Sequence, residues 1–141
     1  MKKFELTAEF VTNVFGKKLF RIKALVAFGD VEKGELGGFI EKEDNLSHDD
    51  NAWVSGNARV SGNAQVSGNA DYAAVAGFGR YSRTTTFFRC KDKILRVQCG
   101  CFYGDLAQFR EIVKKTHGDS KYAKEYLAIA DLMELHFSDE C

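Results

Sequence analysis

The side chains best suited to chemistry lie in one basic segment, in which aromatic rings are interleaved with cations. From Arg80 the segment reads RYSRTTTFFRCKDKILR. Guanidinium groups hold phosphates in a planar fork, and aromatic rings stack on nucleobases. The segment therefore predicts a binding site for a nucleotide, a short nucleic-acid element or a partner, made by Arg80, Tyr81, Arg83, Phe88, Arg89, Lys91 and Lys93. The alternative is an ordinary strand with charges outside and aromatic rings inside, because no glycine-rich phosphate loop accompanies the segment.

Cysteine and histidine side chains offer a second kind of chemistry, a zinc centre. Cys99 and Cys101 are two residues apart, Cys90 is expected across a hairpin from Cys99, and His117 or His136 could approach them. Strong zinc signatures contain two closely spaced pairs, whereas a CxC pair on a strand also occurs in plain cores. We therefore favour buried free cysteines and predict neither a metal nor a cofactor.

The elements that position these residues begin with a repeat of six residues. From Asp49 the sequence reads DDNAWV, SGNARV, SGNAQV, SGNADY and AAVAGF. Bulky apolar residues recur every six positions, each preceded by an alanine two positions earlier (Val54, Val60, Val66, Tyr72 and Phe78; Ala52, Ala58, Ala64, Ala70 and Ala76). This spacing is typical of neither an α-helix nor a simple strand. It predicts a flat-sided coil with valine inside and serine, glycine and asparagine at the corners.

Residues 54–59, 60–65 and 66–71 resemble the hexapeptide-repeat family, whose block is an aliphatic residue, a small or acidic residue, two free positions, a small residue and one more. The resemblance implies a short left-handed parallel β-helix with three blocks per coil. Five blocks then make fewer than two coils, which bury too few large side chains to be stable alone. We therefore expect caps at both ends and a homo-oligomer, with a trimer favoured.

The segments on either side of the repeats are expected to form these caps. Residues 4–28 alternate apolar and polar side chains around a turn at 15–18, which predicts a β-hairpin. Residues 81–89 and 94–99 predict a second hairpin, followed by helices that begin after Asp105 and at Ser120. The predicted fold is mainly β with C-terminal helices: an N-terminal hairpin cap (residues 1–33), a hexapeptide-repeat β-helix (34–79) and a C-terminal ββαα module (80–141).

Composition narrows the class of protein. The 141 residues include 20 basic and 20 acidic side chains, so net charge marks neither a general nucleic-acid binder nor a DNA mimic. A hydrophobic content of 45% is enough for a packed core. The chain starts with an alternating segment rather than a long apolar run, which predicts neither a signal peptide nor a membrane span. The chain also has only four cysteines, and together these features predict a cytoplasmic protein.

The run CGCFYGDLAQFREIVKKTHGDSKYAKEY, residues 99–126, resembles the terminal module of small phage and prophage proteins that also carry hexapeptide blocks. The shared features are GCF, a following glycine, an aromatic residue five positions later, and HG between two helices. The resemblance implies a phage or prophage origin. We expect a non-enzymatic counter-defence protein that either occupies a host nuclease, such as a CRISPR effector, or sequesters a nucleotide signal.

Two alternatives remain open. Hexapeptide-repeat proteins include many acyltransferases, in which a histidine acts as general base. His48 is the only histidine near the repeats and would be that base, although an exposed loop residue is the preferred interpretation. The second alternative is a structural component of the virion.

Overall fold

The described part of the chain folds into two four-stranded sheets and two α-helices. The computed structural model describes residues 2–13, 15–48, 51–67, 71–78, 83–99 and 102–138, with only the backbone of Arg83. The first sheet contains β1 (Phe4–Thr12), β2 (Lys18–Ala24), β3 (Leu36–Ile40) and β4 (Arg59–Val60), and a short 3-10 helix, η1 (Glu43–Asn45), follows β3. The second sheet contains β5 (Tyr72–Phe78), β6 (Arg83–Arg89), β7 (Leu95–Cys99) and β8 (Phe102–Asp105), and the helices are α1 (Leu106–His117) and α2 (Lys121–His136).

The first sheet starts with the hairpin that the alternating sequence predicts. β1 pairs antiparallel with β2, and β2 pairs antiparallel with β3. Asn13 closes the hairpin turn, because its side-chain oxygen accepts hydrogen bonds from the backbone N–H groups of Phe15 and Lys17, both at 2.9 Å. Phe4 and Ile22 face inward and are completely buried.

Two glycines allow β3 to lie directly on the repeats. A Cβ atom at Gly37 would come within 2.5 Å of the Val54 carbonyl oxygen, and one at Gly38 within 2.7 Å of the Ala58 carbonyl oxygen. The hydrogen bonds need this close approach: Gly38 N–H donates to the Val54 carbonyl at 2.7 Å. Any larger side chain at either position would separate β3 from the segment it pairs with.

The predicted left-handed parallel β-helix is wrong. Parallel pairing in the described residues is limited to β3 with β4 and to a bridge between Leu46 and Val66. The residues expected to form the last blocks instead make β5, which pairs antiparallel with β6. The prediction that the alanines and valines of the earlier blocks point inward is confirmed, because all of them are buried (Ala52, Val54, Ala58, Val60, Ala64 and Val66).

Spacing and length explain the difference. The parallel partners are separated by 20 residues, from Ile40 to Val60 and from Leu46 to Val66, whereas three blocks of six would require 18. Beyond this layer, residues 63–65 pair with 89–91: Gln65 N–H donates to the Arg89 carbonyl at 2.9 Å. A strand of the second sheet therefore takes the place of the next coil, because the repeats are too few to supply one. We expected a trimer because a short solenoid would need support from other copies. Since the chain forms no such solenoid, this reason no longer applies.

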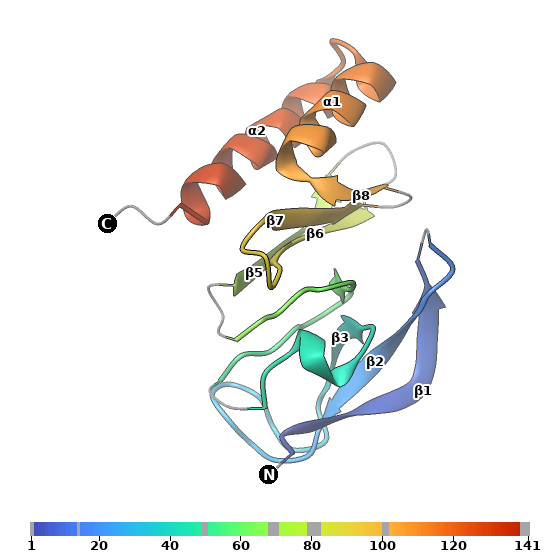
Figure 1. Cartoon of the computed structure of the whole chain (residues 1–141), viewed down its shortest axis with the longest axis vertical. Helices are drawn as coiled ribbons and strands as arrows, with labels where there is room; N and C mark the ends of the chain where they lie inside the picture. The colour runs from blue at the N-terminus through green and yellow to red at the C-terminus, as the bar shows by residue number, and fades with distance from the viewer. Residues whose placement is uncertain are drawn as a thin grey trace.

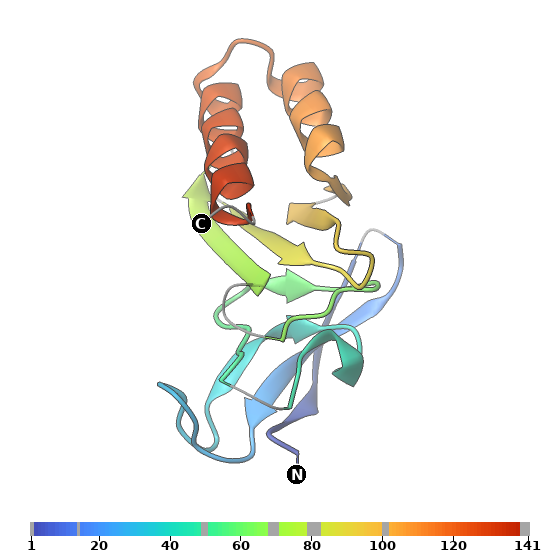
Figure 2. The same ribbon diagram turned by 60° about the vertical axis from the view of Figure 1, so that its left-hand side comes forward.

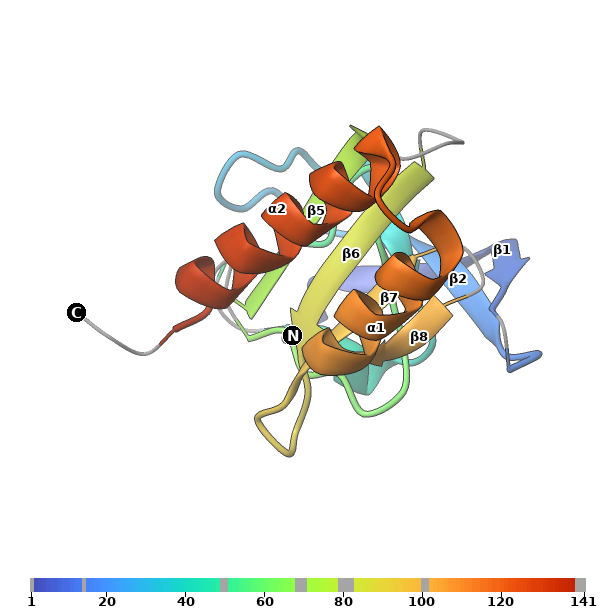
Figure 3. The ribbon, with the colours of Figure 1, turned by 90° about the horizontal axis from the view of Figure 1, so that it is seen from above.

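The second sheet forms the middle layer of the molecule. Its strands follow one another in sequence order, and every neighbouring pair is antiparallel. Both helices lie on one side of this sheet, and the repeats with the first sheet lie on the other (Figures 1 and 2). Seen from above, α2 lies over the β5 side and α1 over β7 and β8 (Figure 3). Neither helix is long and apolar enough to cross a membrane, as far as the described residues go.

Neighbouring residues of β6 face different cores, because successive side chains of a strand point to opposite faces. Phe88 packs into the core of the repeats and the first sheet, with Trp53 and Val66. Phe87 packs into the core under the helices, with Phe109 and Met133 among its neighbours. The middle sheet therefore closes both cores.

Both helices begin at the capping residues expected from sequence. Asp105 accepts a hydrogen bond from Gln108 N–H at 2.8 Å, and the Gln108 side chain accepts one from Asp105 N–H at 3.0 Å. Ser120 caps α2 through a longer bond of 3.4 Å from Ala123 N–H. Gly118 ends α1 with a φ of 58°, a backbone conformation that favours glycine.

Candidate functional site

The loop between β2 and β3 covers a cavity of about 430 Å³, which we call the acidic cavity. Phe28 and Val31 exchange backbone hydrogen bonds of 3.0 and 2.7 Å across a tight turn at Gly29 and Asp30. This turn holds Asp30 beside Asn51 and Trp53 of the first repeat block. The cavity is lined by Gly29, Asp30, Val31, Glu35, Asn51, Trp53, Ser55 and Tyr72.

Aromatic side chains form one part of its wall. Trp53 is 94% buried and meets Phe28 edge-on, with 5.4 Å between the ring centroids. Its indole N–H has no hydrogen-bond acceptor among the described residues. Tyr72 reaches the cavity from β5, and its hydroxyl lies 3.1 Å from both the backbone nitrogen and the Oγ of Ser55. A buried aromatic wall and an unused donor are features of a binding site.

Two acidic side chains give the cavity its charge. Asp30 and Glu35 line it, and no lysine or arginine does among the residues that the structure describes. Glu35 also accepts a hydrogen bond from the backbone N–H of Glu32 at 3.2 Å, which holds the loop in shape. Carboxylates beside aromatic rings attract a cation through both charge and the ring quadrupole. The acidic cavity is therefore suited to an ammonium or guanidinium group and unsuited to a phosphate.

Sequence reasoning missed this cavity, although one signal was present. Trp53 occupies the position that holds Arg59, Gln65 and Asp71 in the following blocks. An indole in place of a polar side chain distinguishes this block from the three that follow it. Asp30 and Glu35 carried no comparable signal, because they lie outside the repeat.

The residues of the predicted basic site occupy different environments. Phe88 is completely buried between the second sheet and the repeats. Lys91 and Lys93 are exposed in the turn between β6 and β7. Arg80 and Tyr81 lie outside the described residues, and the side chain of Arg83 is not described. These three assignments stay predictions.

The described arginines of this segment already have partners. Arg89 forms an ion pair with Asp71 at 3.5 Å and donates to the carbonyl of Phe137 at 2.8 Å. Arg96 forms an ion pair with Asp92 at 3.0 Å. Arg83 and Arg89 also begin and end β6, about 20 Å apart at about 3.3 Å per residue. A phosphate at this surface would compete with carboxylates for each described guanidinium group.

His48 is held as part of the packing around the N-terminal strand. Its Nδ1 accepts a hydrogen bond from Lys3 N–H at 3.0 Å, and its ring stacks on Phe4 with 4.1 Å between centroids. Its Nε2 is shielded from water without a partner among the described residues. The histidine that the acyltransferase alternative requires is therefore not presented to a substrate.

The cysteines are separated by the middle sheet. Cys90 lies in the core on the repeat side, whereas Cys99 packs against the helices and accepts a hydrogen bond from Thr85 at 3.2 Å. Burial raises the pKa of Cys90, although the nearby Arg96 opposes this shift. No group of three or more metal-ligating side chains forms within the described ranges, and Cys101 falls outside them.

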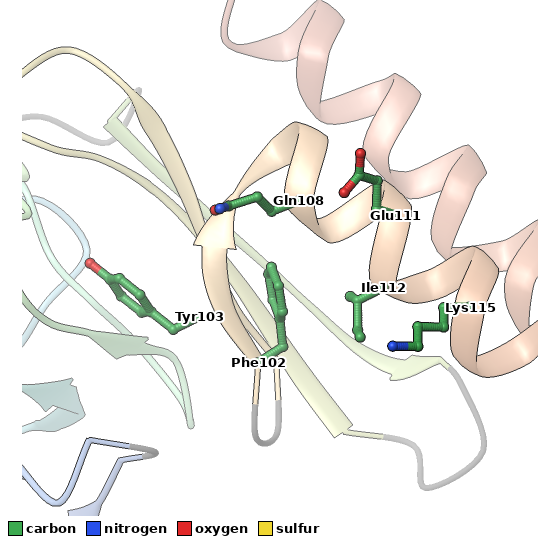
Figure 4. Close-up of a pocket in the computed structure, with 6 residues that line it drawn as sticks. All are labelled: Phe102, Tyr103, Gln108, Glu111, Ile112 and Lys115. Atoms are coloured by element: carbon green, nitrogen blue, oxygen red, sulfur yellow. The ribbon is translucent and has the colours of Figure 1, made fainter.

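A second hollow, of about 340 Å³, lies between β8 and α1 (Figure 4). Phe102 lies beside the helix, whereas Tyr103 points away from it (Figure 4). Gln108 is committed to the cap of α1 through Asp105. Glu111 and Lys115, one helical turn apart, line the hollow together, so it offers no single sign of charge. We assign no ligand to it.

Comparison with known proteins gives no relative for this chain. No protein-family model, curated protein or solved structure matches it. The resemblance to hexapeptide-repeat and phage proteins stays an expectation, and the site has to be interpreted from its geometry.

Proposed function

We propose that this chain is a non-enzymatic binding protein that occupies a basic surface of a partner protein, with the acidic cavity receiving a lysine or arginine side chain. The observation that carries the proposal is the cavity itself, in which Asp30, Glu35 and Trp53 converge. Its size of about 430 Å³ is ample for one long cationic side chain.

This geometry favours one form of the counter-defence hypothesis over the other. A host nuclease, such as a CRISPR effector, binds nucleic acid through lysine and arginine, and these side chains fit an acidic receptor. A nucleotide signal would need free cations, whereas Arg89 and Arg96 are paired with carboxylates. Action on such a nuclease would place the protein in the host cytoplasm, and any self-association would serve to present several receptors at once.

The first test uses Trp53 as the reporter, because it is the only tryptophan of the chain. N-acetyl-arginine amide, N-acetyl-lysine amide and a lysine- and arginine-rich peptide are titrated while its fluorescence is followed. We expect saturable binding that weakens with added salt. The double substitution Asp30→Asn with Glu35→Gln should weaken binding about tenfold, the equivalent of about 1.4 kcal/mol.

Glu32→Gln is the matched control, because Glu32 is an exposed acid of the same loop that does not line the cavity. It removes one charge and should leave binding almost unchanged. Equal binding by the double variant and the native chain would refute the proposal. Pull-down from host lysate with native mass spectrometry then tests the partner and the oligomeric state, and co-purification with particles would indicate a virion component instead.

A further inference from the structure

A third cavity, of about 190 Å³, lies where the β1–β2 turn, the repeats and β8 meet. The turn contributes Phe15 and Lys17, the repeat side contributes Glu41 and Ser61, and β8 contributes Tyr103. The two aromatic rings meet edge-on, with 5.4 Å between their centroids. Four segments distant in sequence therefore build one small chamber with an aromatic wall.

Ser61 is the feature that points to a ligand. It is 99% buried, and its hydroxyl has no hydrogen-bond partner among the described residues. Ser55 occupies the equivalent corner of the preceding block, where its hydroxyl lies 3.1 Å from the hydroxyl of Tyr72. A buried hydroxyl without a partner is costly, so an occupant that bonds to Ser61 would be stabilised.

Tyr103 lies near Ser61 as Tyr72 lies near Ser55, but its hydroxyl approaches Gly62 rather than the serine hydroxyl. A Cβ atom at Gly62 would lie 2.6 Å from the Tyr103 hydroxyl oxygen. Burial raises the pKa of Tyr103 to about 12, so its hydroxyl keeps its proton in neutral solution. Two neutral hydroxyl groups thus line the chamber: that of Ser61 has no partner among the described residues, whereas that of Tyr103 also contacts the Cys90 thiol.

The charged groups of the chamber balance. Lys17 can only donate hydrogen bonds, and Glu41 can only accept them. One oxygen of Glu41 already accepts from Gly62 N–H at 3.0 Å. A ligand that suits this set is uncharged and carries several groups that both donate and accept.

We infer that this chamber is a binding site for a neutral polyhydroxyl ring of monosaccharide size, held by Ser61, Lys17 and Glu41 against Phe15 and Tyr103. Hydroxyl groups match a mixed donor and acceptor lining, and the carbon face of a sugar ring packs on aromatic side chains. The inference is independent of the acidic cavity, which has different residues and a different reporter.

The test is an NMR titration of the full chain with glucose, galactose, ribose and methyl glucoside, each up to about 50 mM, since millimolar affinity is expected of so small a site. We expect saturable shifts of the Ser61 and Gly62 amide signals. Binding of methyl glucoside would indicate the terminal sugar of a glycan, and a preference for ribose would indicate a nucleoside. Acetate should give no saturable shift.

Ser61→Ala distinguishes a binding role from a structural one. Removing a hydroxyl that has no partner should leave the melting temperature unchanged or higher, while sugar binding weakens about threefold to tenfold, the value of one hydrogen bond. Ser55→Ala is the matched control: it should lower the melting temperature through loss of the bond to Tyr72 and leave sugar binding unchanged. Absence of saturable shifts in the native chain, undiminished binding by Ser61→Ala, or soaked crystals with only water in the chamber would overturn the inference.

Discussion

Arg21, on β2, connects the N-terminal hairpin to β3. Its Nε donates to Glu9 at 2.9 Å, its Nη1 donates to the Gly37 carbonyl at 2.6 Å, and its guanidinium group lies 4.3 Å from the centre of the Phe39 ring. The Arg21 side chain is only 17% exposed, so water screens its contacts with Gly37 and Phe39 weakly, whereas Glu9 is 58% exposed and its ion pair is screened more strongly. One residue therefore holds β1, β3 and β2 together.

We expect Arg21→Ala to lower the free energy of unfolding by about 2 kcal/mol, the value of a partly buried, charged hydrogen bond with its ring contact. Urea denaturation followed by Trp53 fluorescence measures the change. Lys23→Ala, an exposed cation on the same strand, should cost less than about 0.5 kcal/mol. Equal losses from the two substitutions would show that the contacts of Arg21 contribute nothing specific.

Tyr103 should make stability depend on alkaline pH. Its pKa is about 12 in the folded chain, against an ordinary tyrosine value of 10.0, because burial penalises the phenolate. The folded state therefore binds more protons than the unfolded state between these two values, and stability falls as pH rises through them. The melting temperature of the native chain should fall more steeply over this range than that of Tyr103→Phe. Tyr122→Phe, at an exposed tyrosine, should behave like the native chain.

At the scale of elements, helix α1 depends on a reciprocal cap. Asp105 and Gln108 each satisfy the backbone N–H of the other, at 2.8 and 3.0 Å. Asp105 is also the last residue of β8, so the cap fixes the direction in which α1 leaves this strand. Arg110 adds ion pairs to Asp131 and Glu134, which tie α1 to α2.

Asp105→Ala should lower the free energy of unfolding by about 1 kcal/mol, because it leaves the N–H of Gln108 without its acceptor. Ser120→Ala should cost less, since the corresponding bond at α2 is 3.4 Å long. Thermal denaturation followed by circular dichroism at the helix band gives both values. A larger loss for Ser120→Ala would contradict the ranking that these distances imply.

At the scale of the molecule, the middle sheet makes one unit of two cores. Phe87 and Phe88 are adjacent, both are completely buried, and they belong to different cores. Opening either core would expose one face of β6 and weaken its pairing with β5 and β7. Unfolding of one core should therefore propagate to the other.

We expect a single cooperative transition in urea. Fluorescence of Trp53 reports the first core, and the helix signal in circular dichroism reports the second, so the two curves should coincide. Phe87→Ala and Phe88→Ala should each shift both curves together, by about 3 to 5 kcal/mol. Two separated transitions would instead indicate two independent units that divide near the predicted boundary at residue 79.

Local patterns were sufficient for much of the secondary structure. Alternation predicted the hairpin of β1 and β2, capping residues predicted the starts of α1 and α2, and the phase of the repeat predicted that Val54, Val60 and Val66 point inward. Each of these features depends on residues only a few positions apart. The sequence alone therefore contained the information needed to predict them.

Contacts between distant segments decided the rest. The repeats were expected to continue stacking on themselves, but β5 pairs with β6, and residues 63–65 pair with 89–91. Likewise, Asp30, Glu35, Trp53 and Tyr72 share a cavity only because a loop, a repeat and an edge strand converge there. A six-residue period specifies which side chains are buried. It does not specify which other segment forms hydrogen bonds with the unpaired backbone groups of the last repeat block. The tertiary structure selects that partner, because many segments can offer the same hydrogen bonds and only the packing of the whole chain discriminates among them.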